Sequence, residues 1–145
     1  MPVVWARRPE AVLDVVGRWP GAEPRVDDRR VRLHGFVPQM APLYRAARCC
    51  VAPVLGGGGT PLKVVVALAY GLPLVATPQA LRGLPEVAGS GLVRCAPTAT
   101  RFAEEVLALL DASYEHGDRA RRSRELVERH YSVTALSGTL AESLS

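Results

Sequence analysis

The stretch that decides the fold is PVLGGGGTPLKVVVALAYG at residues 53–71, where a strand end, four glycines and a helical segment follow one another. Thr60 is a good N-cap residue, and Pro61 suits the first helical position because its missing N–H costs nothing there. Gly71 suits the end of a helix. These boundaries predict a helix over residues 60–70, although three adjacent valines favour a strand. Since this helix is apolar nearly all round, we expect it to be buried.

The loop formed by Gly56, Gly57, Gly58 and Gly59 lies between the strand and the helix. Glycines let backbone N–H groups approach a ligand closely, and the N-terminus of a helix adds partial positive charge. Lys63 adds a full positive charge in the first helical turn. This arrangement is typical of a phosphate site at the carboxyl end of a strand. A flexible loop in which the glycines only turn the chain remains the alternative.

Two familiar phosphate-binding motifs do not match this loop. A P-loop needs a serine or threonine after its lysine, and here Lys63 is followed by Val64. A dinucleotide-binding fingerprint needs GxGxxG after the first strand, and the first strand here leads into GRWPG at residues 17–21. The sequence therefore predicts a phosphate site of another kind.

Short apolar runs alternate with helical segments along the whole chain, with no linker or repeat between them. We expect strands at residues 11–16, 31–37, 49–54, 72–77 and 91–95, helices at residues 38–48, 60–70, 100–110, 115–129 and 133–144, and a loop at residues 78–90. This alternation predicts one α/β domain over residues 1–145, with an open, mostly parallel sheet of about five strands and helices on both faces.

Composition and charge narrow the class of protein. The chain is 48% apolar and 22% charged, which is an ordinary globular balance. No apolar run approaches the roughly 18 residues that span a bilayer, and no signal peptide is evident, so we expect a cytoplasmic protein without a transmembrane segment. The net charge of +4 derives largely from a C-terminal run of arginines in which acids are interleaved. That run favours a solvated helix face over a nucleic-acid or membrane contact.

The cysteines indicate neither a disulfide framework nor a metal site. Cys49 and Cys50 are adjacent, and Cys95 stands alone. They lack CxxC spacing and a neighbouring histidine cluster, so we expect no metal and no other cofactor. We interpret them as small buried apolar residues of a reducing compartment.

Three stretches together resemble the C-terminal domain of group 1 (family 4) glycosyltransferases of the GT-B fold. They are RRPEAVLDVVGRWP, then VRLHGFVPQMAPLYRAARCCVAPVLGGGGTPLKVVVALAYGLPLVATPQALRGLP, and finally FAEEVLALL with RELVERHYS. The resemblance covers about residues 5–135. It implies a Rossmann-like domain that holds a nucleotide-diphosphate sugar such as a UDP- or GDP-sugar, for retaining glycosyl transfer to an acceptor bound by a separate N-terminal domain.

The resemblance also implies which residues face the donor. The glycine loop and the helix start would face the diphosphate or the sugar, with the lysine close by. The loop after the second strand would line the base pocket, and one glycine after the first strand would let that loop pass close to the nucleotide. The implied donor-binding residues are Gly56, Gly57, Gly58, Gly59, Thr60, Lys63, Phe36, Val37, Pro38 and Gly17.

Two positions depart from the family pattern of two glutamates spaced across this segment. The first falls at Gly58, where some relatives also carry small residues. The second, which usually holds the ribose hydroxyls, falls at Val66. Since valine offers no hydrogen-bond acceptor, we expect donor affinity to fall by about ten- to a hundredfold.

The resemblance places Met1 inside the first helix of the family domain, so we expect a chain truncated at its start that is inactive alone. No residue stands out as a catalytic base: His34 lies in a strand, His116 and His130 lie on charged helices, and Glu86 is interpreted as a surface acid. A degenerate remnant without catalysis remains an alternative. So does an interaction subunit that needs a separate N-terminal half or forms a homo-oligomer.

Overall fold

The computed structural model describes residues 1–18, 21–22, 24–57, 61–112 and 116–132. The strands are β1 (Leu13–Val15), β2 (Val31–Leu33), β3 (Cys50–Ala52), β4 (Leu74–Ala76) and β5 (Val93–Cys95). The helices are α1 (Pro2–Arg7), α2 (Ala41–Ala46), α3 (Leu62–Ala69), α4 (Pro85–Gly89), α5 (Ala99–Asp111) and α6 (His116–Tyr131), with a short 3-10 helix η1 (Pro78–Leu81). Each expected strand is present in a shorter form.

All strand pairs are parallel, and the strands lie in two sheets. In one sheet β1 pairs with β2, with Leu13 opposite Val31. In the other, β4 lies between β3 and β5, and its Leu74 is opposite Cys50 on one side and Val93 on the other. The parallel α/β architecture is confirmed. The five strands are divided between two sheets because β1 and β3 do not pair with each other.

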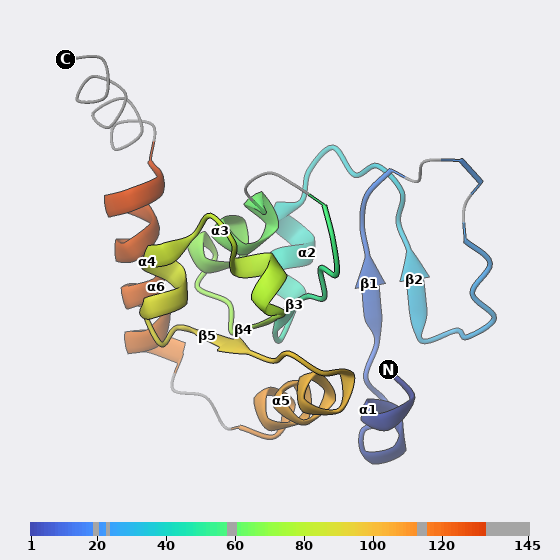
Figure 1. The fold of residues 1–145 in the computed structure, drawn as a ribbon. Coiled ribbons are helices and arrows are strands. Elements are labelled where there is room, and N and C mark those ends of the chain that lie inside the picture. Colours follow the sequence, from blue (N-terminus) through green and yellow to red (C-terminus); the bar gives the residue numbers. More distant parts are fainter. Residues whose placement is uncertain (19–20, 23, 58–60, 113–115, 133–145) are drawn as a thin grey trace.

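Helices cover both faces of the three-stranded sheet. Leu74 and Ala76 point to one face and belong to a buried cluster with Leu68 of α3. Val75 points to the other face and belongs to a second buried cluster with Leu109 of α5. Figure 1 shows α5 on one side of the sheet and α3 and α4 on the other. Because successive side chains of a strand point to opposite faces, this short apolar strand supplies both cores.

Helix α3 ends as the sequence predicts, at Gly71. The Gly71 N–H donates to the carbonyl of Leu68 at 2.8 Å, and the Leu72 N–H donates to the carbonyl of Ala67 at 3.0 Å. These two bonds form a Schellman motif, which needs a left-handed residue at the position after the cap. Gly71 has a φ of 70°, which a glycine adopts without the steric cost of a Cβ.

The start of α3 differs from the prediction. Pro61 is the N-cap rather than the first helical residue, and its carbonyl accepts a hydrogen bond from the Val64 N–H at 2.8 Å. The helix therefore begins at Leu62. The predicted capping role of Thr60 lies outside the described residues.

The prediction that α3 is buried all round is wrong on one side. Leu62, Val66 and Tyr70 are 68%, 36% and 36% exposed, and they recur every four residues along one stripe. The opposite side of the helix is buried against the sheet and against α6. Apolar content alone does not reveal this difference, because the side of a helix that meets a neighbour is set by the tertiary packing.

The predicted loop at residues 78–90 is wrong, since this segment contains η1 and α4. Pro78 and Pro85 occupy the first positions of these two short helices, where proline is well accommodated. Leu84 and Val87 are buried in the core. Apolar residues spaced for burial therefore turn the segment into packed helical turns.

The last helices differ from prediction mainly in how they are buried. In α5, Thr98 caps the helix by accepting a hydrogen bond from the Arg101 N–H at 3.2 Å. Helix α6 is not only a charged surface helix, because Ser123 is buried and Leu126 packs against the core.

The helix expected at residues 133–144 lies outside the described residues. In the described part of the chain, no helix combines the length and apolar content required to cross a bilayer.

The cysteines are less uniformly buried than expected. Cys49 and Cys50 are half-buried, and burial raises the pKa of the Cys50 thiol to about 12. Cys95, the last residue of β5, is exposed, because it ends the outer strand of its sheet. The interpretation of all three as buried apolar residues is therefore wrong for Cys95.

Candidate functional site

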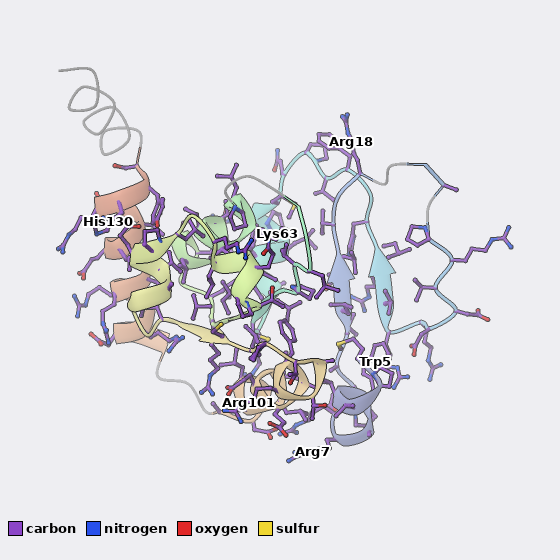
Figure 2. All side chains as sticks on the ribbon, in the orientation of Figure 1. Trp5, Arg7, Arg18, Lys63, Arg101 and His130 are labelled. Atoms are coloured by element: carbon purple, nitrogen blue, oxygen red, sulfur yellow. The ribbon has the colours of Figure 1, made fainter. Side chains whose placement is uncertain are left out.

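The loops that follow the parallel strands carry most of the predicted donor-binding residues. Gly17 follows β1, Phe36 follows β2, and Gly56 follows β3. Figure 2 shows Arg18 at the end of the molecule toward which β1 and β2 run, whereas Trp5 and Arg101 lie at the opposite end. In open α/β sheets ligands bind at the carboxyl ends of the strands, so these loops are the candidate site.

The described part of the glycine loop has an open backbone. Leu55 is 91% exposed, and a Cβ placed on Gly56 or Gly57 would meet no atom within 4 Å. Gly57 has a φ of 102°, a conformation that side-chain-bearing residues rarely adopt. No atom of the described residues therefore lies within 4 Å of these two Cβ positions. Gly58, Gly59 and Thr60 lie outside the described residues.

Two side chains from the loop after β4 hold the glycine loop in place. The Thr77 hydroxyl donates a hydrogen bond to the carbonyl of Val54 at 2.5 Å and accepts one from the Ala80 N–H at 3.3 Å. The side-chain amide of Gln79 donates to the carbonyl of Gly57 at 3.0 Å. Sequence reasoning missed both residues. The threonine before a proline is a helix-start signal that marks Thr77, whereas no signal marks Gln79.

The loops after β1 and β2 contact each other. The Gly17 N–H donates a hydrogen bond to the Gly35 carbonyl at 2.8 Å. The Arg18 guanidinium lies over the Phe36 ring, 4.8 Å from its centroid, and the ring is 64% exposed. The structure thus brings Gly17 and Phe36 together and adds Arg18, which was not predicted. A stacked guanidinium and aromatic ring form a flat surface that suits a planar ligand group.

Pro38 and Val37 continue the loop after β2, and they differ in burial. Pro38 is exposed, whereas Val37 is half-buried. The two predicted groups, around Gly17 with Phe36 and around Gly56 with Gly57, follow strands of different sheets. The hydrogen bonds and the ring contact described above each lie within one of these two groups.

The exposed side of α3 carries Lys63 and Val66, three residues apart and therefore on neighbouring positions of one helix face. Val66 is 36% exposed, so a longer side chain at this position would reach solvent rather than the core. Further along the same face, the Tyr70 ring stacks on that of Tyr44 with centroids 4.8 Å apart. The face is cationic near the loop and apolar beyond it.

The titratable residues considered as catalytic bases have other contacts. His34 Nε2 lies 2.6 Å from a carboxylate oxygen of Asp14, one strand away. Glu86 accepts a hydrogen bond from the Tyr131 hydroxyl at 2.7 Å, which lowers the pKa of Glu86 and, with burial, raises that of Tyr131. The contact of His34 joins the β1 and β2 segments, and that of Glu86 joins α4 and α6. Neither contact directs the side chain toward the glycine loop.

The other two histidines are both on α6. His130 lies on α6 (Figure 2), and the side chain of His116 is outside the described residues. Within the residues that the structure describes, no group of three His, Cys, Asp or Glu side chains is arranged to hold a metal ion.

A comparison with curated proteins finds no match to this chain. The sequence does match the family described as Glycosyl transferases group 1, over residues 1–112. The matched span runs from α1 through α5 and includes the loops after the first four strands. On this match over more than half of its length, the chain belongs to the group 1 glycosyl transferases.

Proposed function

We propose that this chain binds a nucleotide-diphosphate sugar at the carboxyl ends of its strands and is the donor-binding half of a retaining glycosyltransferase. The observation that carries the proposal is the open backbone at Gly56 and Gly57, which Thr77 and Gln79 brace immediately before α3. The family match supports glycosyl transfer in general. We infer in addition that the donor is a nucleotide-diphosphate sugar and that a separate half binds the acceptor.

The diphosphate is the part of the donor that the glycine loop suits. At Gly56 and Gly57, no atom of the described residues lies within 4 Å of a Cβ position, which leaves room there for an anion beside the main chain. The N-terminus of α3 adds partial positive charge, and the exposed Lys63 adds a full charge one turn away. Backbone amides, a helix terminus and a lysine suit a diphosphate without a metal ion, so we propose none.

The loops after β1 and β2 suit the base of the nucleotide. Phe36 is 64% exposed, which leaves the ring face opposite Arg18 available for stacking. Arg18 holds the ring from one side and contributes positive charge. Backbone groups of Val37 and Pro38 follow directly along the chain. Uracil and guanine both carry carbonyl and N–H groups that backbone atoms recognise, so we propose a UDP- or GDP-sugar.

Val66 favours a second candidate function, a remnant of the family that no longer transfers sugar. Its side chain reaches the exposed face of α3 but offers no acceptor to the ribose hydroxyls. Charge-assisted hydrogen bonds of this kind contribute about 1.5–3 kcal/mol. A remnant would keep the fold without binding a donor, whereas a donor-binding half that lacks this glutamate would still bind one weakly.

Calorimetry of UDP and GDP binding to the wild-type chain and to Val66→Glu separates these two functions. We expect the wild-type chain to bind one of the nucleotides weakly, and Val66→Glu to bind it about tenfold or more tightly. Ala69→Glu is the matched control, because it adds the same charge to an exposed position farther along α3. It should leave the affinity unchanged or slightly lower. No heat with either nucleotide, for the wild-type chain and for Val66→Glu alike, would establish the remnant.

A further inference from the structure

The loops after β1 and β2 are joined so that a large aromatic side chain stays at the surface. The Gly17 N–H donates a hydrogen bond to the Gly35 carbonyl at 2.8 Å. Gly35 has a φ of 59°, a left-handed conformation that glycine adopts without the steric cost of a Cβ. The next residue, Phe36, is 64% exposed. The turn after β2 therefore presents an aromatic ring to solvent at the carboxyl ends of the strands.

Arg18 covers one face of the Phe36 ring and leaves the other face open. The guanidinium carbon of Arg18 lies 4.8 Å from the centroid of the ring. Among the described residues, Arg18 forms no ion pair that would draw its charge away from the ring. A cation attracts the π electrons of the ring toward its own side, so the opposite face becomes less negative. That opposite face suits an electron-rich aromatic group better than an isolated phenylalanine does.

The glycines beside the ring leave room for a large planar group. A Cβ placed on Gly17 or on Gly35 would meet no atom of the described residues within 4 Å. Pro38, two residues after Phe36, is itself exposed. At these positions the described residues therefore set no close limit on the size of a group that stacks on the ring.

The other loops at this end of the sheets contain no carboxylate. No aspartate or glutamate occurs between residues 29 and 85, a span that includes the loops after β2, β3 and β4. These loops therefore do not repel a diphosphate, but they also offer the ribose hydroxyls no charged acceptor. Stacking of the base on Phe36 is the contact that remains to hold the nucleoside.

We propose that the site selects a purine nucleoside diphosphate, whose base stacks on the open face of Phe36. A purine has two fused rings, so it covers the phenyl ring more completely than a pyrimidine does, and it is the more electron-rich base. Arg18 strengthens this preference from the opposite face. The inference rests on the proposed donor binding and narrows it, because a GDP-sugar is then favoured over a UDP-sugar. Since the ring reads the face of the base and not its edge, adenine and guanine bind alike.

Dissociation constants of four nucleotides for the full chain test this selection. GDP, ADP, UDP and CDP are titrated separately to about 10 mM, and the amide resonances of Gly35 and Gly57 report binding. We expect the two purine nucleotides to bind about tenfold more tightly than the two pyrimidine nucleotides. We also expect GDP and ADP to differ by less than about threefold, because both bases offer a similar face for stacking.

Variants of Phe36 and Arg18 show which side chain produces the preference. Phe36→Leu removes the ring and keeps an apolar side chain, so the four nucleotides should bind within about threefold of one another. Phe36→Tyr keeps the ring and should keep the preference. Arg18→Met removes the charge and keeps an unbranched stem, so the ratio of purine to pyrimidine affinity should fall by about two- to fivefold.

Arg7→Met is the matched control for Arg18→Met. Arg7 is an exposed arginine in the last turn of α1, at the opposite end of the molecule from Arg18 (Figure 2). The control removes the same charge from the chain, so it should leave the ratio of purine to pyrimidine affinity unchanged. Comparison of ratios within each variant cancels any general loss of affinity for the diphosphate that follows from a lower positive charge.

The results that would overturn the purine selection differ from those that would overturn donor binding. Binding of no nucleotide would overturn the proposed function, and the purine selection with it. Binding without a purine preference, or a preference that survives in Phe36→Leu, would overturn the purine selection and leave donor binding intact. GDP bound about tenfold more tightly than ADP would assign the selection to the edge of the base and overturn the stacking argument. An unchanged ratio in Arg18→Met would overturn the contribution of Arg18.

Discussion

The side-chain amide of Gln79 donates a hydrogen bond to the carbonyl oxygen of Gly57 at 3.0 Å, so the loop after β4 holds the loop after β3. Thr77, two residues earlier, donates to the carbonyl of Val54 in the same loop. A glycine-rich loop loses much conformational entropy when it is ordered, and these two contacts supply part of that ordering before a ligand arrives. The proposed phosphate site is thus organised by residues that do not face the ligand themselves.

Replacing Thr77 by valine should destabilise the chain and loosen the glycine loop. The substitution removes a hydroxyl from a buried side chain that both donates to Val54 and accepts from Ala80. We expect a loss of about 1–3 kcal/mol in the free energy of unfolding, measured by urea denaturation. Thr98→Val is the control, because it removes a helix cap from α5 at an exposed position. Both variants should lose stability, but only Thr77→Val should shift the amide resonance of Gly57. Equal effects on that resonance would contradict the bracing role.

Gly71→Ala should be among the more damaging single substitutions in the core. The φ of 70° disfavours a side chain by about 1–2 kcal/mol, and a Cβ would lie 2.7 Å from the Cβ of Ala120 in α6. Overpacking of that kind costs about 1–3 kcal/mol more. We therefore expect thermal or urea unfolding to show a total loss of about 2–5 kcal/mol.

Gly91→Ala separates the two causes of that loss. Gly91 has a φ of 69°, yet a Cβ there would meet no atom within 4 Å. Gly91→Ala should therefore lower the free energy of unfolding only by the cost of a side chain at positive φ, about 1–2 kcal/mol. If the two variants were equally stable, the close packing of α3 against α6 at Gly71 would be contradicted.

Glu105 should contribute more stability than its neighbour Glu104. The Glu105 carboxylate is 11% exposed and pairs with Arg94 at 2.5 Å and with Arg101 at 2.6 Å. Glu104 is 53% exposed and, among the described residues, pairs only with Arg101, at 3.2 Å. We expect Glu105→Ala to cost about 1–3 kcal/mol, against less than about 0.5 kcal/mol for Glu104→Ala. Urea unfolding of both variants makes the comparison, and an equal cost would show that burial of the pair adds nothing.

The hydrogen bond between Tyr131 and Glu86 should make stability depend on pH at both extremes. The tyrosine hydroxyl lowers the pKa of Glu86 from its ordinary 4.5, so the stabilisation is present above that value and is lost as pH falls through the lowered pKa. Burial and the carboxylate raise the pKa of Tyr131 from its ordinary 10.0, so the stabilisation is present below that value and is lost as pH rises through the raised pKa.

Tyr131→Phe measures this contribution directly. The Tm difference between wild type and Tyr131→Phe should be largest between about pH 5 and pH 9 and should shrink outside that window. Glu86→Gln should show the same dependence, because it removes the charged partner of the same bond. A Tm difference that stays constant from pH 3 to pH 11 (roughly the accessible range) would mean that the bond does not form in solution.

The positions of the strands were predictable because each is a short apolar run bounded by glycine, proline or charge. Their lengths were not, since apolar residues such as Val54 extend the run beyond the part that forms a ladder. The division of the five strands into two sheets could not be predicted from the sequence either. The order of elements predicts parallel pairing, but it does not say that the edges of β1 and β3 remain apart.

The candidate site was predictable where its residues are adjacent in sequence. The glycines and Lys63 form one continuous segment, so their chemistry is visible without a fold. Thr77 and Gln79 reach the same loop from the next strand, about 20 residues on, and no local pattern encodes that contact. The exposure of Val66 was missed for a similar reason, because the packing of α3 on α6 decides which helix face remains open.

Binding of a nucleotide diphosphate by the backbone around Gly56 and Gly57 is tested most directly by amide NMR. UDP and GDP are titrated into the ¹⁵N-labelled chain to about 10 mM, in the affinity range expected for a weak site. If the diphosphate binds there, we expect the largest saturable shifts with one of the two nucleotides at Gly56, Gly57 and Lys63, with smaller shifts at Phe36. Shifts absent from these residues, or confined to the arginines of α6, would contradict it.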